Sequence, residues 1–295
     1  MTGAFLGIIG GSGVYDIPGV ADLREERVAS PWGEPSDAIR TGRIGDTRVA
    51  FLPRHGRGHR FAPGDINYRA NIDALKRIGV TDLVSVNAVG SLREALSPGT
   101  FVLVNQYIDR TVERPRSFFG NGFVAHVPMA RPVSPRLGDR IAGAAHAEGI
   151  ACVRGATLVV IEGPAFSTEA ESHLFRSWGA DLVGMTAMPE ARLAREAEIA
   201  YATLAMVTDY DSWHPGHDAV DVASVVRVLG ENRDRVQRLL ARLARDFPAE
   251  HEPCPYADRA LDGAVMTAPE ARDPDLVARL DAVAGRVLRH GDGME

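Results

Sequence analysis

The sequence predicts a single α/β domain over residues 1–295, built on a twisted mixed β-sheet flanked by helices. Short apolar, β-branched runs recur along the chain, and stretches with helical spacing lie between several of them, which is the pattern of strands covered by helices. The sequence contains no repeats, low-complexity tracts or Gly/Ser-rich linkers that would divide it into two domains. The expected strands are residues 5–9, 49–52, 83–86, 101–104, 157–161 and 201–207.

Three stretches between or after these strands are expected to be helical. Residues 64–78 place apolar side chains about every 3.6 positions. Residues 167–178 begin with Ser-Thr followed by acidic residues, a common helix start, and residues 218–246 are long, arginine-rich and amphipathic. The segment 110–135 is too long for a plain connector, and irregular loops of this length are often functional.

Composition and charge exclude several classes of protein. The chain has 33 basic and 39 acidic residues, and a net charge of −6 argues against a general nucleic-acid binder. Its two cysteines, Cys152 and Cys254, cannot form a disulfide framework, and no Cys/His cluster has the spacing of a zinc site, so we expect no metal. The first apolar run is short and lacks a preceding basic region, so we expect a soluble, cytoplasmic protein with no membrane partner.

Two glycine-containing segments that follow strands are candidate anion sites. Gly10-Gly11-Ser12-Gly13 would let backbone N–H groups and the Ser12 hydroxyl approach an oxyanion, although the same segment also fits a tight turn. A dinucleotide fingerprint would need a glycine where Asp16 stands.

The second segment, residues 53–59, concentrates basic side chains in one loop. Arg54 offers a planar fork for phosphate, His55 can donate beside it, and Arg57 and His59 add to the local positive charge. A metal site on the two histidines is disfavoured by the intervening glycines and the absence of a carboxylate. A solvated basic turn is the alternative, but ligands bind at this edge of open α/β sheets.

Further candidates follow three later strands. Small residues in 86–91 would let a ligand lie against the backbone, or form a turn. Phe166, after Gly-Pro, could be a flat wall for an aromatic ring instead of a core residue, and Thr186 adds a hydroxyl. Asp209 and Asp211 would point to one side of an extended backbone, where a desolvated carboxyl has a raised pKa and can act as a general acid; an Asp turn capping a strand is the alternative.

From the residues alone, the chain is interpreted as a phosphate-using or phosphate-binding α/β enzyme. Anion donors, an aromatic wall and paired carboxyls at strand ends suit the transfer of a sugar from a heterocyclic base to phosphate.

From Gly7 to about Val226, the chain resembles the purine nucleoside phosphorylase superfamily, and most closely its S-methyl-5′-thioadenosine phosphorylase branch. The motifs that carry the resemblance are, in order, GIIGGSG, PRHGRGH, NYRANIDALK, NAVGSLRE, QYIDRT, HVPMA, IEGPAFSTEAE, WGADLVGMTAMPEARLAREA and TDYDSWH. The resemblance implies a partly barrel-like sheet and the phosphorolysis of 5′-deoxy-5′-(methylthio)adenosine to adenine and 5-methylthioribose 1-phosphate, in purine and methionine salvage. Inorganic phosphate would be a co-substrate, and no cofactor or metal would be needed.

The resemblance also implies roles for individual residues. Asp209 would be the catalytic acid that protonates N7 of the base, with Asp211 beside it. Phosphate would be held by Ser12, Arg54, His55, Asn87, Ala88 and Thr186. The base and the sugar would be contacted by Phe166, Ser167, Val183, Met185, Asp209 and Asp211.

Base preference is expected from two of these positions. A 6-oxopurine enzyme of the superfamily carries Glu after the Phe and Asn in place of Asp209, whereas this chain has Ser167 and Asp209. A carboxyl group at position 209 accepts from a 6-amino group and repels a 6-oxo group, so we expect adenine to be preferred over hypoxanthine.

The 5′ side of the sugar is expected to involve a second subunit. His126 aligns with a position that a neighbouring subunit contributes in this family, so the resemblance implies a homotrimer or hexamer. Val222 and Val225 match the apolar pocket for the 5′-methylthio group. The alternatives are a phosphorylase of another 5′-substituted adenosine, a phosphorylase of 6-oxopurine nucleosides or thioinosine, a hydrolase that uses water, and a catalytically silent nucleotide-binding protein.

Overall fold

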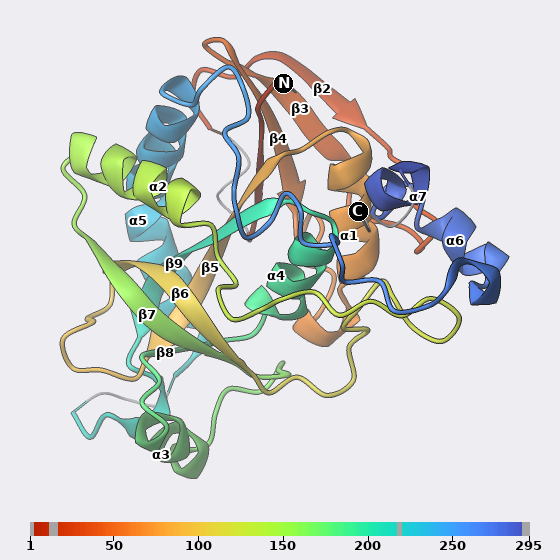
Figure 1. The fold of residues 1–295 in the computed structure, drawn as a ribbon. Coiled ribbons are helices and arrows are strands. Elements are labelled where there is room, and N and C mark those ends of the chain that lie inside the picture. The colour runs from red at the N-terminus through yellow and green to blue at the C-terminus, as the bar shows by residue number, and fades with distance from the viewer. Residues whose placement is uncertain (1–2, 12–16, 217–219, 291–295) are drawn as a thin grey trace.

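A computed structural model of the chain describes residues 3–11, 17–216 and 220–290 (Figure 1). The described strands form one sheet in the order β2-β3-β4-β1-β5-β8-β7-β6-β9, and β5 also pairs with β9. This second pairing closes β5, β8, β7, β6 and β9 into a five-strand barrel, from which β1, β4, β3 and β2 extend. The prediction of a mixed, partly barrel-like sheet is therefore confirmed.

The strands and helices have the following bounds. The strands are β1 (Phe5–Gly10), β2 (Ala21–Glu26), β3 (Ile39–Ile44), β4 (Thr47–Pro53), β5 (Asp82–Ser91), β6 (Phe101–Asp109), β7 (Cys152–Val160), β8 (Leu182–Gly184) and β9 (Ala200–Asp209). The helices are α1 (Tyr68–Arg77), α2 (Pro135–Ala147), α3 (Glu169–Ser177), α4 (Ala187–Glu196), α5 (Val222–Arg245), α6 (Pro274–Arg279) and α7 (Gly285–His290). Short 3₁₀ turns lie at Pro63–Asp65, Asp211–Trp213 and Pro269–Ala271.

Helices cover both faces of the sheet at its centre, which explains why strands such as β1, β5 and β9 are largely apolar, whereas the edge strand β2 is exposed and charged. In β1, Phe5 and Ile9 belong to the apolar cluster shared with α1 and α4, whereas Leu6 and Ile8 belong to the cluster shared with α2 and α5. Figure 1 shows α2 and α5 side by side on one face and α1 and α4 on the other. Alternate residues of one strand are thus buried in two different cores.

The expected helices form, with small shifts at their starts. Helix α1 begins at Tyr68 because the Asn67 side chain accepts a hydrogen bond from the Ala70 N–H and caps it, while residues 63–65 form a separate 3₁₀ turn. Helix α3 begins with a capping box between Thr168 and Glu171.

Helix α5 begins later than the sequence pattern suggests. The side chain of Asp221 accepts from the Ser224 N–H and caps the helix. Position 218, where the expected helix began, lies outside the described residues. None of the helices in the described ranges is both long and apolar enough to cross a membrane.

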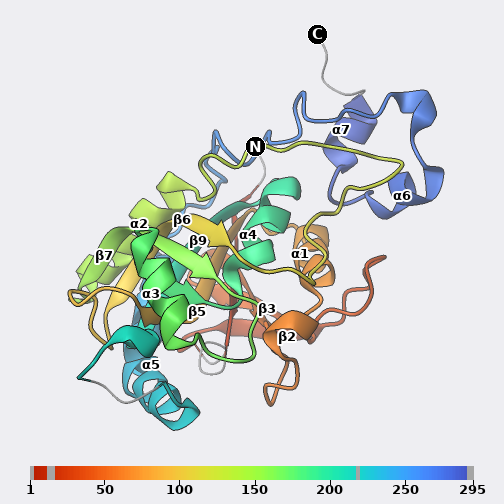
Figure 2. The same ribbon diagram turned by 90° about the horizontal axis from the view of Figure 1, so that it is seen from below.

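The C-terminal segment packs against the barrel and against the 110–135 loop. His251 lies between two carboxylates, with 3.0 Å from Nδ1 to Asp82 Oδ2 and 3.0 Å from Nε2 to Asp258 Oδ2. Hydrogen bonds to Asp258 and Asp82 raise the pKa of His251 to about 9, so the ring is charged at neutral pH. Figures 1 and 2 place α6 and α7 at the periphery, on the side of α1. That the whole chain is one domain stays a prediction.

The partners of β5 change along one of its edges, and this change leaves an opening in the sheet, namely an interval of β5 with no described strand paired to that edge. Strand β1 pairs with residues 82–85 of β5, and β8 pairs with Gly90 and Ser91. Residues 86–89 lie between these two partners on that edge. In α/β sheets, a place where the strand order switches is where ligands bind.

Candidate active site

The ends of β1 and β4 lie next to each other at this opening. Gly10 is opposite Pro53 in the parallel pair, and the Arg54 N–H donates to the Gly10 carbonyl over 2.9 Å. The first anion-site candidate therefore starts beside the second. Ser12, the predicted phosphate ligand of the first segment, lies outside the described residues.

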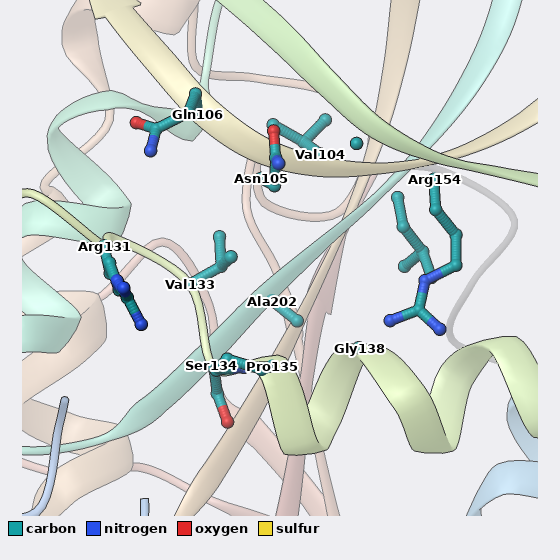
Figure 3. Close-up of a pocket in the computed structure, with 12 residues that line it drawn as sticks. Val104, Asn105, Gln106, Arg131, Val133, Ser134, Pro135, Gly138, Arg154 and Ala202 are labelled. Carbon is teal, nitrogen blue, oxygen red and sulfur yellow. The ribbon is translucent and has the colours of Figure 1, made fainter. Parts of the chain in front are cut away.

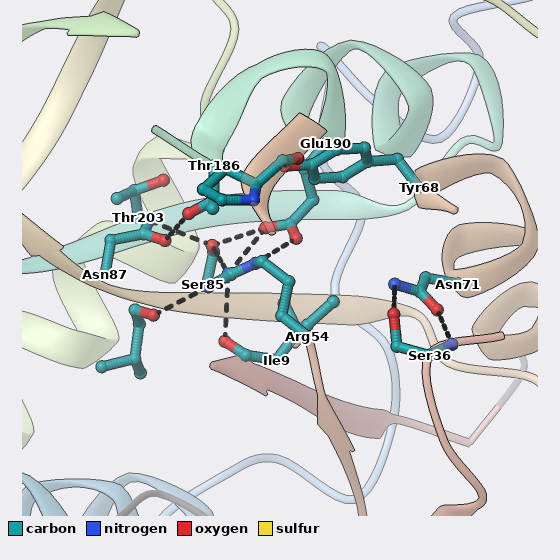
Figure 4. Close-up of polar contacts among 12 residues, drawn as sticks. Ile9, Ser36, Arg54, Tyr68, Asn71, Ser85, Asn87, Thr186, Glu190 and Thr203 are labelled. Carbon is teal, nitrogen blue, oxygen red and sulfur yellow. Dashed lines mark hydrogen bonds and ion pairs between the residues drawn. The ribbon is translucent and has the colours of Figure 1, made fainter. Parts of the chain in front are cut away.

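Arg54 is almost completely buried, with 1% of its surface exposed, and forms a bidentate ion pair with Glu190 (Figure 4). The Nε atom lies 2.7 Å from Glu190 Oε2, and Nη2 lies 3.0 Å from Oε1. Burial lowers the pKa of Arg54, but the carboxylate of Glu190 outweighs this and raises it, so the guanidinium remains charged. Nη1 donates to the Val86 carbonyl over 3.2 Å, directly at the opening beside β5.

Asn87 and Thr186 meet at the same place, although they are far apart in the chain. The Thr186 hydroxyl donates to Asn87 Oδ1 over 2.9 Å, and Asn87 Nδ2 donates to Ser85 Oγ over 3.2 Å. Ala88 is the one exposed residue of the otherwise buried strand β5. The predicted phosphate ligands Arg54, Asn87, Ala88 and Thr186 are thus brought together around one opening.

His55 is buried beside Arg54, but in a state that differs from the expected donor. Its Nδ1–H donates to the Phe61 carbonyl over 2.9 Å, and the ring stacks on His59 with 4.1 Å between centroids. Burial lowers the pKa of His55 to about 4, so the imidazole is neutral at neutral pH. With the proton on Nδ1, Nε2 is an acceptor and suits a protonated phosphate oxygen better than an anionic one.

The rest of the basic loop does not point to the opening, which corrects the expectation of a four-residue basic cluster. Arg57 and His59 are exposed, and Arg57 forms ion pairs with Glu25 and Asp37 over 2.6 and 3.7 Å. Gly56 has a φ of +69°, which turns the chain outward directly after His55. Only the first two basic residues of the loop face inward.

Asp209 and Asp211 are adjacent, but the extended backbone expected between them is wrong. Tyr210 has φ −96° and ψ 22°, and Asp211 has φ +47°, so the chain turns here. The Asp211 N–H donates to Asp209 Oδ1 over 2.8 Å, and the Thr208 hydroxyl donates to Oδ2 over 2.7 Å. This is the Asp turn that the sequence left as the alternative.

The environment of both carboxyls favours their protonated forms. Burial raises the pKa of Asp209, against the hydrogen bonds from Thr208 and the Asp211 N–H, which lower it. Burial also raises the pKa of Asp211, and the negative charge of Asp209 adds to this, while the Ser172 hydroxyl lowers it. A Cβ at Gly90 would lie 2.8 Å from Asp209 Oδ1, so only glycine leaves room for this pair.

The segment that carries Phe166 and Ser167 is hydrogen-bonded to the turn that holds Asp209 and Asp211, here named the carboxyl turn. Ser172 Oγ donates to Asp211 Oδ2 over 2.6 Å, and Ser212 Oγ donates to the Ser167 carbonyl over 2.7 Å. The Ser167 hydroxyl is near enough to lower the pKa of Asp211, yet it is buried without a hydrogen bond of good geometry. Phe166 is 40% exposed, so it is not a core residue and its ring is accessible to a ligand.

Met185 and Val183 complete the cluster. Val183 is opposite Gly90 in the pair of β5 and β8. Arg114, from the 110–135 loop, donates from Nη1 to the Met185 carbonyl over 2.6 Å and from Nε to Glu162 Oε1 over 2.6 Å. The loop that the sequence singled out therefore anchors the segment before Thr186.

Three predicted residues lie outside this cluster. The side chain of His126 is exposed, and the backbone N–H of His126 donates to the Ala264 carbonyl of the C-terminal segment over 2.8 Å. Val222, at the start of α5, is 67% exposed, and Val225 is partly exposed. Their surfaces are available to a ligand or to another subunit.

Several residues of the site were missed from the sequence: Ser85, Arg114, Ser172 and Glu190. Glu190 lies within the stretch MTAMPEA, which carries part of the resemblance, but the resemblance implies no role for its carboxylate. A glutamate in a helix usually lies on the surface, so no local signal distinguishes this one.

Two hollows in the described part of the chain are lined by residues other than those of this cluster. One, of about 430 Å³, lies between β6, β7 and the start of α2 (Figure 3). Another, of about 520 Å³, is lined by Arg27, Ser36, Arg60 and Phe61. Two polar side chains that line the first are engaged elsewhere, Gln106 with the Ala130 carbonyl and Arg154 with Asp139. Across the ranges that the structure describes, no group of three or more His, Cys, Asp or Glu residues could hold a metal ion.

Comparison with known proteins links this geometry to a family. The model of the Phosphorylase superfamily matches residues 5–245. The chain is 63% identical to the S-methyl-5′-thioadenosine phosphorylase of Bradyrhizobium diazoefficiens, over 98% of this chain and 100% of that protein.

Solved structures show the same relationship. The chain superposes with a TM-score of 0.90 on the crystal structure of a methylthioadenosine phosphorylase from an antarctic soil metagenomic library, at 46% identity over 96% of this chain and 99% of that one. It superposes with a TM-score of 0.79 on the methylthioadenosine phosphorylase of Schistosoma mansoni in complex with adenine, at 37% identity over 84% of this chain and 93% of that one.

Proposed function

The chain belongs to the phosphorylase superfamily, and from that premise we infer that it is an S-methyl-5′-thioadenosine phosphorylase, a pentosyltransferase. It converts 5′-deoxy-5′-(methylthio)adenosine and phosphate to adenine and 5-methylthioribose 1-phosphate, a reaction of purine and methionine salvage. The similarity to relatives of this activity runs over almost the whole chain, which supports the activity as well as the fold.

The single structural observation that carries this function is that β5 lies beside both a group of anion donors and a pair of carboxyls. Asn87 accepts a hydrogen bond from Thr186, and the Val86 carbonyl accepts one from Arg54. Gly90, farther along the same strand, lies against Asp209 and Asp211. Asn87 and Gly90 are about 10 Å apart at the rise of a β-strand. A nucleoside along this strand end can therefore reach an anion site at one end and a carboxyl at the other.

We propose that phosphate binds at the Arg54 end. Among the described residues, Nη1 of Arg54 bonds only the Val86 carbonyl, so its second N–H is left for phosphate. The hydroxyl of Thr186, the backbone at Ala88 and the side chain of Asn87 line the same opening, and His55 would accept from a protonated phosphate oxygen. Ser12 is proposed as a further donor from the loop after β1.

At the other end, Asp209 is proposed as the acid that protonates N7 of the adenine leaving group. The glycosidic bond stretches toward an oxocarbenium-like sugar, phosphate attacks the anomeric carbon, and the proton from Asp209 lets adenine leave as a neutral base. Phe166 would pack on the purine ring. Asp211, whose carboxyl accepts from Ser172, would bond the edge of the base. Ser167, whose carbonyl accepts from Ser212, would bond it as well.

The sugar is proposed to lie between these groups, against Met185 and Val183. The exposed apolar side chains of Val222 and Val225 would receive the 5′-methylthio group, because burial of a thioether on apolar residues is favourable by roughly 1–3 kcal/mol.

His126 is proposed to reach the sugar of a neighbouring subunit, so the active protein would be a homotrimer or a hexamer of two trimers, in the cytoplasm. Its exposure and its support by the C-terminal segment agree with a contact outside its own chain. Light scattering coupled to an activity assay should find activity only in the oligomer. A fully active monomer would contradict this assembly.

Substrate choice is tested by adenine release across a matched series of nucleosides. We expect release to depend on phosphate, and methylthioadenosine to be preferred over its 6-oxo counterpart by up to roughly 10⁴-fold, because the carboxyl at position 209 repels a 6-oxo group. Adenosines that differ only at 5′ (methylthio, hydroxyl, hydrogen or halogen) rank the fit of the apolar pocket. Equal turnover of thioadenosine and thioinosine would refute the base preference, and release of adenine without phosphate would indicate a hydrolase.

The role of Asp209 is tested by the pH dependence of turnover. An acid must be protonated, so the rate should fall as the pH rises through the raised pKa of Asp209. Thr208→Val removes a hydrogen bond that lowers this pKa, so the fall should move to higher pH, whereas Thr208→Ser should leave it in place. Asp209→Ala should lose about 10²–10⁴-fold in turnover while the protein stays folded.

Two results would contradict this role of Asp209. One is near-normal turnover by a folded Asp209→Ala protein. The other is an alkaline fall in rate that stays at the same pH in both Thr208 variants. Circular dichroism and thermal unfolding of each variant show whether a loss of rate reflects a loss of fold.

A further inference from the structure

Glu190 has no surface exposed to solvent and takes no part in the chemistry proposed above. Four donors nevertheless converge on its carboxylate. Oε2 accepts from Arg54 Nε over 2.7 Å, and Oε1 accepts from Arg54 Nη2, Ser85 Oγ and Tyr201 Oη over 3.0, 2.6 and 2.9 Å. A carboxylate with this many donors is held in one orientation, and so are the groups that bond it.

Ser85 extends this arrangement to the other side of the phosphate site. Its hydroxyl donates to Glu190 and accepts from Arg54 Nη2 over 2.6 Å and from Asn87 Nδ2 over 3.2 Å. Asn87 in turn accepts from the Thr186 hydroxyl. A continuous chain of hydrogen bonds therefore runs from Glu190 to Arg54, Asn87 and Thr186, three of the side chains proposed to hold phosphate (Figure 4).

Stability alone does not explain why a charged pair lies here. Both charges are removed from water, and a buried ion pair often stabilises a protein no more than well-packed apolar residues do. What the pair does supply is geometry. A guanidinium with two hydrogen bonds to one carboxylate cannot change its orientation by rotation about the side-chain bonds. The N–H of Nη1 that is not bonded to Val86 therefore points in a fixed direction.

We propose that Glu190, acting with Ser85, is the positioning residue of the phosphate site. It fixes the guanidinium of Arg54 toward the opening beside β5 and, through Ser85, fixes the amide of Asn87 and the hydroxyl of Thr186 opposite it. The proposal rests on the proposed function, in which these three side chains bind inorganic phosphate. Phosphate then binds to donors that are already oriented, which lowers the cost of ordering them.

Two variants that each remove one hydroxyl from the same carboxylate oxygen separate positioning from general support. Ser85→Ala and Tyr201→Phe both delete a donor to Glu190 Oε1, but only Ser85 also bonds Arg54 and Asn87. Steady-state kinetics of the full-length protein with varied phosphate, and separately with varied methylthioadenosine, give the two KM values. Thermal unfolding confirms that each variant is folded.

We expect Ser85→Ala to raise the KM for phosphate about tenfold and to change the KM for methylthioadenosine less than about twofold. Tyr201→Phe should leave both values near those of the unmodified protein. Glu190→Asp, which keeps the charge but shortens its reach, should also raise the KM for phosphate selectively. If it fails to fold, the comparison of Ser85 and Tyr201 decides on its own.

Equal effects of Ser85→Ala and Tyr201→Phe on the KM for phosphate would overturn the proposal, as would equal rises in both KM values for Ser85→Ala. Arg54→Lys distinguishes this failure from a failure of the proposed function. If Arg54→Lys weakens phosphate use while Ser85→Ala does not, the positioning role is refuted and the phosphate site stands. If Arg54→Lys also leaves the KM for phosphate unchanged, the assignment of the phosphate site itself is wrong.

Discussion

Arg54 and Glu190 come from the end of β4 and from α4, 136 residues apart in the chain, and their side chains meet where both are hidden from solvent. A lone guanidinium buried at this depth would be costly, and a lone carboxylate equally so. Each is tolerated because the other neutralises it and because Ser85 and Tyr201 donate two further hydrogen bonds to Oε1 of the carboxylate. In the proposed site, this arrangement gives the barrel a wall of donors that are oriented before phosphate arrives and whose charges nearly balance. A protein with a net charge of −6 can thus use a small anion without a basic surface.

The topology of the sheet explains why this wall lies where it does. Strand β5 is paired with β1 along its first residues and with β8 at its end, and the interval between them contains exposed Ala88 and the Val86 carbonyl that Arg54 bonds. The parallel pairing of β5 with β9 brings Asp209 beside Gly90. In the proposed mechanism, one strand therefore carries both ends of the reaction, with the nucleophile near the middle of β5 and the leaving group near its end. The distance between them follows from the register of the strands and not from any flexible loop.

Much of this site could be predicted from the sequence, because Arg54, Asn87, Asp209 and Asp211 lie at or near the ends of apolar runs and the ends of parallel strands gather at one edge of a sheet. Arg57 shows where such reasoning fails. Arg57 is the same residue type as Arg54 and lies in the same loop of the sequence. Only the turn at Gly56 directs its side chain outward to Glu25. Glu190 and Ser85 could not be recognised, because a glutamate in a helix and a serine in a strand carry no local mark of a partner elsewhere in the chain. Their role depends on long-range packing.

The claim that the ion pair serves phosphate binding and not stability is tested most directly by the double variant Arg54→Met with Glu190→Leu. Buried ion pairs replaced by apolar residues of similar size are often neutral or stabilising by about 1–4 kcal/mol. We therefore predict that the midpoint of urea unfolding of the double variant is at least as high as that of the unmodified protein. The double variant should nevertheless have lost phosphate-dependent release of adenine. A double variant that is equally stable and keeps the KM for phosphate of the unmodified protein would contradict the account.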